Sequence, residues 1–212
     1  MVLPELIFDL DDTLIRSFDG YVELHQRIAS ELGWPVPTAD ELVEYGPTWP
    51  ETLARLWPGR SLDPFLARYE EIADDVRYPA FEGVVEALVD LHGRGRRLWI
   101  VSQRSRTRMG QRMAEAGLRE EWFAGIFAHE DQPFGKPDPR CFTPVWDRIG
   151  GPRHALYVGD RQGDRLAAEA AGLPFLAVQT GPEARRGFPG DLEPTRVLTS
   201  AAEVPDWLAR FE

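Results

Sequence analysis

The chain of 212 residues is long enough for one sizeable hydrophobic core, or for a core domain with a small accessory domain. Its 35 acidic and 24 basic residues give a formal net charge of −11, which disfavours general binding to nucleic acid or to anionic lipid. A metal ion and a few local cations can still hold an anionic substrate inside a cleft.

Cys141 is the single cysteine, so the chain can form neither an intramolecular disulfide nor a thiolate metal cluster. The first residues lack the basic start and the apolar stretch of a signal peptide. No segment has the roughly 18 consecutive apolar residues that a membrane span needs. We therefore expect a cytoplasmic protein that acts without a membrane partner.

The chain begins with an apolar run at residues 6–8, which predicts a buried strand and ends in acidic residues. The following stretch, up to about residue 78, carries helical patterns broken by prolines and glycines, and shows no clear strand. The predicted helices cover residues 21–32, 40–45, 51–57 and 64–76. This part of the chain therefore predicts an all-helical insert.

After Pro79 the pattern alternates between helix and strand. The predicted strands cover residues 98–101, 126–128, 155–158, 175–178 and 196–198, and the predicted helices cover residues 84–92, 106–116, 140–149, 165–171 and 201–211. Continuous apolar strands separated by helices are typical of an α/β fold, in which a parallel sheet is covered on both faces.

Polar and charged residues lie beyond several of these strands. In a doubly wound parallel sheet the carboxyl ends of the strands share one edge, and ligands bind there. The residues expected at this edge are Asp9, Asp11, Ser102, Lys136, Asp160 and Asp164. Distant parts of the sequence are therefore expected to meet at one site.

The expected site combines four carboxylates with a lysine and a hydroxyl. Asp9 and Asp11 are two positions apart, so their side chains point the same way in an extended strand. Together with Asp160 and Asp164 they would repel one another unless a cation neutralises them. Carboxylates suit Mg²⁺, which binds through a few carboxylates plus substrate phosphate. The lysine and the hydroxyl can hold phosphoryl oxygens and their developing charge.

Each of these pieces also has a plainer interpretation. Asp-x-Asp, Gly-Asp and Gly-Lys-Pro segments are common in turns, and a serine after a strand is often a helix N-cap. Their combination, in this order and just beyond apolar strands, favours a catalytic site.

The sequence resembles the haloacid dehalogenase-like superfamily in four motifs. The matching segments are Phe8-Asp9-Leu10-Asp11-Asp12-Thr13-Leu14, Ile100-Val101-Ser102, Gly135-Lys136-Pro137-Asp138-Pro139 and Val158-Gly159-Asp160 through Asp164. The resemblance implies a Rossmann-like catalytic core, residues 1–16 and 80–212, with a helical cap domain, residues 17–79, inserted after the first motif. This arrangement is similar to the branch of phosphoglycolate phosphatase and beta-phosphoglucomutase.

The resemblance also implies a role for each residue. Asp9 would attack phosphorus, and Asp11 would protonate the leaving oxygen and then accept a proton from water. Ser102 and Lys136 would bind phosphoryl oxygens. The implied ligands of Mg²⁺ are Asp9, Asp11 through its backbone carbonyl, Asp160, and Asp164 either directly or through water.

Asp11 favours a phosphate ester as the substrate, because resembling dehalogenases and phosphonate-cleaving enzymes lack this second acid. The expected function is Mg²⁺-dependent hydrolysis of the phosphate monoester of a small metabolite through an aspartyl phosphate. A phosphosugar mutase and a non-catalytic binding protein on the same fold stay open as alternatives. The identity of the substrate and the choice between monomer and homodimer stay open as well. Asp12 replaces the glycine of many relatives.

Substrate contacts are expected from the cap and from Arg104. The cap segment at residues 45–49 breaks two helices, and its residues Tyr45, Thr48 and Trp49 either contact the substrate or pack as ordinary aromatic and polar side chains. Arg104 follows Ser102 closely and is placed to meet a second anionic group. For His25 we favour a position at the surface over one near the cleft, and we expect residues 181–194 in a surface loop.

Overall fold

The computed structural model describes residues 5–44 and 49–210 of the chain. The chain divides into two compact units, one formed by Met1–Arg16 with Pro79–Glu212 and the other by Ser17–Tyr78. Each unit has a hydrophobic core of its own. None of the described helices combines the length and the apolar composition that crossing a bilayer needs.

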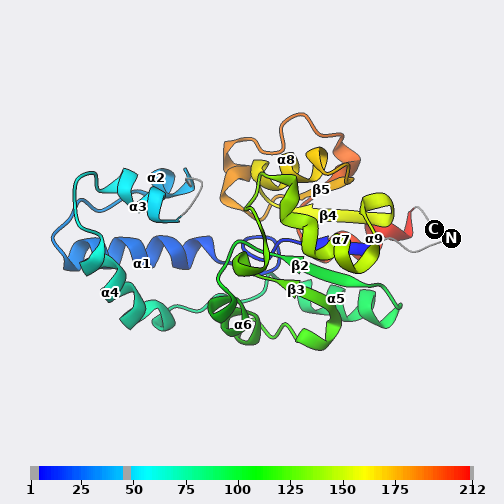
Figure 1. The fold of residues 1–212 in the computed structure, drawn as a ribbon, viewed down its shortest axis with the longest axis horizontal. Coiled ribbons are helices and arrows are strands. Elements are labelled where there is room, and N and C mark those ends of the chain that lie inside the picture. The colour runs from blue at the N-terminus through cyan, green and yellow to red at the C-terminus, as the bar shows by residue number, and fades with distance from the viewer. Residues whose placement is uncertain (1–4, 45–48, 211–212) are drawn as a thin grey trace. The chain divides into compact units, whose positions relative to one another are not determined.

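Within the described residues, the first unit contains one parallel sheet of six strands in the order β3-β2-β1-β4-β5-β6. Figure 1 labels four of these strands, β2, β3, β4 and β5. The strands are β1 (Glu5–Phe8), β2 (Leu98–Val101), β3 (Phe123–Phe127), β4 (Ala155–Gly159), β5 (Phe175–Val178) and β6 (Val197–Leu198). The order reverses at β1, which pairs with β2 on one side and with β4 on the other. In sheets of this type the reversal opens a crevice at the carboxyl ends of the strands, so the topology already favours a site beside β1 and β4.

The predicted α/β class is confirmed, with helices between the strands. These helices are α5 (Val84–Gly93), α6 (Arg106–Glu115), α7 (Thr143–Ile149), α8 (Gln162–Ala170) and α9 (Val204–Ala209). Alternate strand residues such as Ile7, Trp99 and Tyr157 pack in one core with Val145 of α7 and Ala167 of α8. The intervening residues of β1, β2, β4 and β5, including Leu6, are equally buried, as expected for a parallel sheet with two covered faces, whereas the edge strand β3 is only partly buried.

Some expected elements differ from the pattern that predicted them. The helix expected at residues 140–149 begins as a 3₁₀ turn, Pro139–Phe142, before α7. The expected surface loop at residues 181–194 contains a 3₁₀ turn, Pro182–Arg186, and buries Phe188 in the core of the sheet. The apolar side chain of Phe188 explains this difference, because its burial removes a large apolar surface from water.

In the second unit, the described residues form helices and no strand. The elements are α1 (Phe18–Glu31), α2 (Ala39–Val43), α3 (Trp49–Leu56), α4 (Asp63–Ile72) and a 3₁₀ turn at Ala73–Asp75. The sequence explains where α2 begins, because Thr38 and Glu41 form a reciprocal capping box. Aromatic rings fill the interior, with Phe65 in contact with Trp34 and Trp57.

His25 lies inside this aromatic cluster, so the expected surface position is wrong. Its side chain is fully buried, and Trp49 Nε1 donates a hydrogen bond of 3.1 Å to His25 Nε2. The ring Nδ1 therefore carries the proton and donates to the backbone oxygen of Tyr21 at 2.7 Å. Burial lowers the pKa of His25 from 6.5 to about 4, because the charged imidazolium loses its hydration there.

The burial of His25 predicts that the protein loses stability in mild acid. The unfolded chain takes up a proton at His25 below pH 6.5, whereas the folded chain does so only near pH 4. The free energy of unfolding should therefore fall as the pH drops from 6.5 to 4, by about 3 kcal/mol from this residue. Chemical denaturation at several pH values measures the slope.

The variant His25→Gln should show a flatter dependence of unfolding free energy on pH over this range. His92, which is exposed in α5, provides the control His92→Gln, which should keep the slope of the wild type. An unchanged slope in His25→Gln would contradict the prediction.

Candidate active site

Asp9 is the first residue after β1, and a tight turn follows it. The Asp9 side chain is 8% exposed, and its backbone N–H still pairs with Val158 of β4. The chain then turns back, with the N–H of Leu14 donating to Leu10. Asp12 has a φ of +58°, and among the described residues it is the only one other than glycine with a positive φ. Aspartate tolerates this left-handed conformation better than most residues, which explains why it can replace glycine here.

Asp160 and Asp164 reach the same place from β4 and from the first turn of α8. Two glycines make room for them. A Cβ atom on Gly181 would lie 1.9 Å from Asp160 Oδ2, and a Cβ atom on Gly159 would lie 2.7 Å from the Asp164 side chain. The backbone at both positions therefore approaches the carboxylates more closely than any side chain would allow.

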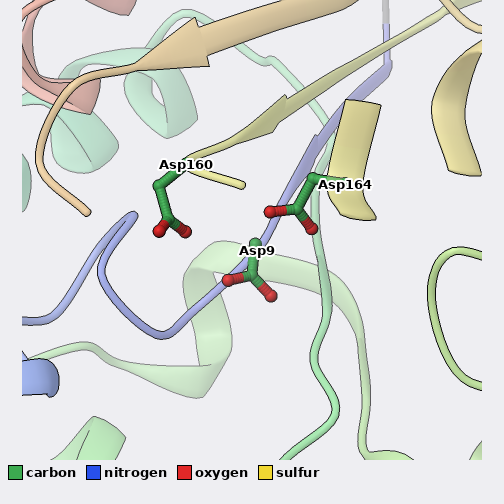
Figure 2. Close-up of side chains that lie close together, drawn as sticks. All are labelled: Asp9, Asp160 and Asp164. Carbon is green, nitrogen blue, oxygen red and sulfur yellow. The ribbon is translucent and has the colours of Figure 1, made fainter. Parts of the chain in front are cut away.

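Three carboxylates converge in this region. Asp9, Asp160 and Asp164 are all buried, and each offers an oxygen within 4.8 Å of the others (Figure 2). Thr13 Oγ1 donates to Asp160 Oδ1 at 3.0 Å. The second oxygen, Asp160 Oδ2, is buried and receives no hydrogen bond from the described part of the chain.

These residues fit a hard divalent cation. Burial raises the pKa of Asp9 to about 7, and the charges of Asp164 and Asp11 add to this shift while Lys136 opposes it. Burial also raises the pKa of Asp160 well above its ordinary value, against the opposing charge of Arg161. A cation beside these oxygens would favour their ionised forms, and Asp160 Oδ2 could bind it directly.

Lys136 lies between two of the carboxylates. Its Nζ donates to Asp9 Oδ1 at 2.5 Å and to Asp164 Oδ1 at 2.7 Å, and its side chain is only 6% exposed. Burial alone would lower the pKa of Lys136, but Asp164 and Asp9 more than reverse this and raise it. The ammonium group is therefore held in its charged form beside Asp9.

Tyr157 is a site residue that the sequence analysis did not identify. Its Oη accepts a hydrogen bond from Lys136 Nζ at 2.9 Å and donates to Asp164 Oδ1 at 2.8 Å. The ring is fully buried on β4 and packs against Phe142. In the sequence it resembles any apolar strand residue, and only its position two residues before Gly159 distinguishes it.

Asp164 accepts hydrogen bonds on both carboxylate oxygens. Oδ1 accepts from Lys136 and Tyr157, and Oδ2 accepts from the backbone N–H of Arg161 at 3.1 Å. These donors hold the carboxylate in one orientation. The arrangement favours Asp164 as the residue that orients the lysine.

Ser102 is buried at the end of β2, as its place in the sequence predicted. Its Oγ accepts a hydrogen bond from the backbone N–H of Arg104 at 3.1 Å. Gln132, a second residue that the sequence analysis missed, donates to the backbone oxygens of Ser102 and Ala128 at 2.6 and 2.9 Å. This amide ties the loop after β3 to the loop after β2.

Asp11 lies at the edge of this arrangement and pairs with Arg104. The guanidinium donates through Nε and Nη2 to both oxygens of the Asp11 carboxylate, with distances from 2.5 to 3.2 Å. Arg104 was expected to contact the substrate, so this carboxylate is a partner that the sequence analysis did not foresee.

Arg161 lies near two other carboxylates. Its Nε lies 3.7 Å from Asp160 Oδ2, and its Nη2 lies 3.9 Å from Asp12 Oδ2.

The three expected cap residues belong to the second unit, Ser17–Tyr78. Tyr45 and Thr48 lie outside the described residues. Trp49 belongs to the second unit, where its ring lies 4.7 Å from that of Tyr69 and its N–H bonds to His25. These contacts favour packing as the role of Trp49, and a contact with substrate stays a prediction.

Comparison with known proteins agrees with the motifs. Residues 6–178 match the haloacid dehalogenase-like hydrolase family. A phosphoglycolate phosphatase of Mesorhizobium japonicum is 32% identical over 198 residues, which cover 85% of each chain. A phosphoglycolate phosphatase of Cereibacter sphaeroides is 28% identical over 99% of each chain.

A solved structure shows the same fold. The haloacid dehalogenase superfamily hydrolase from Geobacter sulfurreducens has a TM-score of 0.70 and 27% identity, over 97% of this chain and 96% of its own. The curated relatives named as phosphatases confirm the prediction of a phosphatase-type enzyme. The match over most of the chain, together with the carboxylates that meet beside β1 and β4, shows that the chain belongs to the haloacid dehalogenase-like hydrolase family.

Proposed function

We propose that this protein hydrolyses the phosphate monoester of a small metabolite with Mg²⁺ and through an aspartyl phosphate on Asp9. The observation that carries this proposal is the buried contact between Lys136 and Asp9, with two more carboxylates beside it. The carboxylate is a nucleophile without a general base once it is ionised, and the ammonium group favours that form.

Asp9, Asp160 and the backbone carbonyl of Asp11 would hold the metal, with Asp164 as a ligand directly or through water. When bound, Mg²⁺ supplies positive charge that offsets the carboxylates and the phosphoryl oxygens. Asp160 Oδ2, which is buried and accepts no hydrogen bond from the described residues, supports this assignment.

In the first half of the reaction an oxygen of Asp9 forms a bond to phosphorus while the bond from phosphorus to the leaving oxygen breaks. Lys136 and the hydroxyl of Ser102 stabilise the phosphoryl oxygens. Asp11 donates a proton to the leaving oxygen, so the alcohol departs neutral. In the second half Asp11 takes a proton from the attacking water, the water oxygen forms a bond to phosphorus, and the bond between Asp9 and phosphorus breaks to release phosphate.

The names of the curated relatives support 2-phosphoglycolate as the first substrate to test. The assignment of residues 17–79 as a cap domain stays a prediction from the sequence. A cytoplasmic location, and a monomer or homodimer, stay predictions from the sequence.

The two alternatives are separated by simple measurements. A phosphosugar mutase would isomerise a sugar phosphate in the presence of a bisphosphate activator, and a binding protein would release no phosphate from any ester. The three buried carboxylates argue against a non-catalytic protein, because bringing them together does not by itself stabilise the fold.

Replacement of the proposed nucleophile should abolish turnover. A phosphate-release screen across a panel of phosphorylated metabolites should identify substrates for the wild type. Asp9→Asn and Asp11→Asn should each release no phosphate from them, while circular dichroism shows a retained fold. Full activity of Asp9→Asn would show that the nucleophile is another group.

Removal of Mg²⁺ should abolish phosphate release, and excess Mg²⁺ should restore it after treatment with EDTA. Mg²⁺ should also raise the melting temperature, because a ligand that binds only the folded protein stabilises it. Asp160→Asn should lose this thermal shift, whereas the surface control Asp90→Asn should keep it. Full activity in EDTA would contradict the assignment of the metal.

Tyr157→Phe should lower kcat about tenfold and leave KM almost unchanged. The hydroxyl orients Lys136 and Asp164 without touching the substrate, and one lost buried hydrogen bond is worth about 1–2 kcal/mol. Steady-state kinetics on the best substrate measures both constants. A change confined to KM, or to thermal stability with kcat intact, would argue against this positioning role.

A further inference from the structure

We propose that Arg104 is the receptor for a second anionic group on the substrate, and that binding of this group releases Asp11 toward the leaving oxygen. The inference rests on the proposed phosphatase function and names the substrate class of that site. The favoured substrate is a phosphate monoester whose alcohol carries a carboxylate or a second phosphate.

Arg104 binds the Asp11 carboxylate through two guanidinium nitrogens, in a fork-like arrangement. Nε lies 3.0 Å from Oδ2 and 3.2 Å from Oδ1, and Nη2 lies 2.5 Å from Oδ1. Both carboxylate oxygens are therefore engaged by one guanidinium. A carboxylate held in this way is not positioned for a leaving oxygen, so the pair describes a resting arrangement of the acid.

The backbone of Arg104 is fixed while its side chain remains accessible. Its N–H donates to Ser102 Oγ at 3.1 Å, and its carbonyl accepts from the N–H of His129 at 3.0 Å. The side chains of Arg104 and Asp11 are 17% and 26% exposed, in contrast to the buried carboxylates beside them. A ligand from solvent can therefore reach this pair without disturbing the backbone.

An anionic group on the substrate can replace Asp11 on the guanidinium. The planar fork of arginine binds carboxylate and phosphate in the same two-point geometry, so the exchange trades one pair for a similar one. Arg104 also lies two residues after Ser102, a proposed ligand of the phosphoryl group, so both anionic groups of one small molecule would be bound by the same loop.

The other cations of the site lie beside carboxylates other than Asp11. Lys136 contacts Asp9 and Asp164, and Arg161 lies near Asp160 and Asp12. Arg104 instead pairs with the acid that must act on the leaving group. Replacement of Asp11 by a substrate anion on Arg104 would couple recognition of the substrate's far end to catalysis. This coupling should appear in kcat as well as in KM.

The test compares 2-phosphoglycolate with 2-hydroxyethyl phosphate, an ester of similar size whose far end is neutral. The wild type should hydrolyse 2-phosphoglycolate with a kcat at least tenfold higher, beyond any difference in KM. In Arg104→Gln, kcat/KM for 2-phosphoglycolate should fall about 10- to 100-fold, the range expected for one lost charge-assisted contact. At the same time kcat for 2-hydroxyethyl phosphate should rise, because Asp11 is no longer held.

Arg94→Gln provides the matched control, because Arg94 forms a surface pair with Asp90 on α5. It should keep the kcat ratio of the wild type. A ratio that persists in Arg104→Gln, or an equal loss on both esters, would overturn the proposal. If Arg104→Gln fails to fold, the wild type alone decides, since equal kcat values for the two esters would also overturn it.

Hydrolysis of p-nitrophenyl phosphate separates this inference from the function on which it rests. Its leaving group departs without help from Asp11, so the wild type should release phosphate from it. Release from p-nitrophenyl phosphate without discrimination between the two test esters would overturn the role of Arg104 alone. No release from these three esters or from any ester of the metabolite panel would overturn the proposed function and this inference together.

Discussion

The charge on Lys136 holds together a group of side chains that would otherwise repel one another. Asp9 and Asp164 approach the same ammonium from β1 and from α8, and Tyr157 bridges the lysine and Asp164 from β4. All of these groups are buried, where a single unpaired charge is strongly unfavourable. The position of the lysine therefore fixes the orientation of both carboxylates and of the loops that carry them.

The sheet topology explains why this arrangement is possible. Asp9 follows β1 and Asp160 follows β4, and these two strands are neighbours although they lie far apart in the sequence. Glycines at positions 159 and 181 let the backbone pass close to the carboxylates. The order of the strands thus positions the site, because the residues that follow the strands are also those that would bind metal and phosphate.

The sequence predicted the parallel sheet and the helical insert well, because strand and helix periodicities in this chain are strong and are separated by glycine and proline. It also predicted that Asp9, Lys136 and Asp160 lie together, because the carboxyl ends of parallel strands must meet. It did not predict Tyr157 or the burial of His25. Both depend on which partner faces the side chain across the core, and periodicity carries no information on hydrogen bonding between elements. The Arg104 fork on Asp11 was missed for the same reason.

The pairing of β1 with β4 also has a consequence during synthesis of the chain. A ribosome-bound chain that ends before residue 155 already contains Asp9, the proposed nucleophile, yet it has no strand on one side of β1 and lacks Asp160 and Asp164. Such a nascent chain cannot assemble the charge balance that the reaction needs. The proposed reaction at Asp9 would therefore begin only after more than two thirds of the polypeptide has been made and folded.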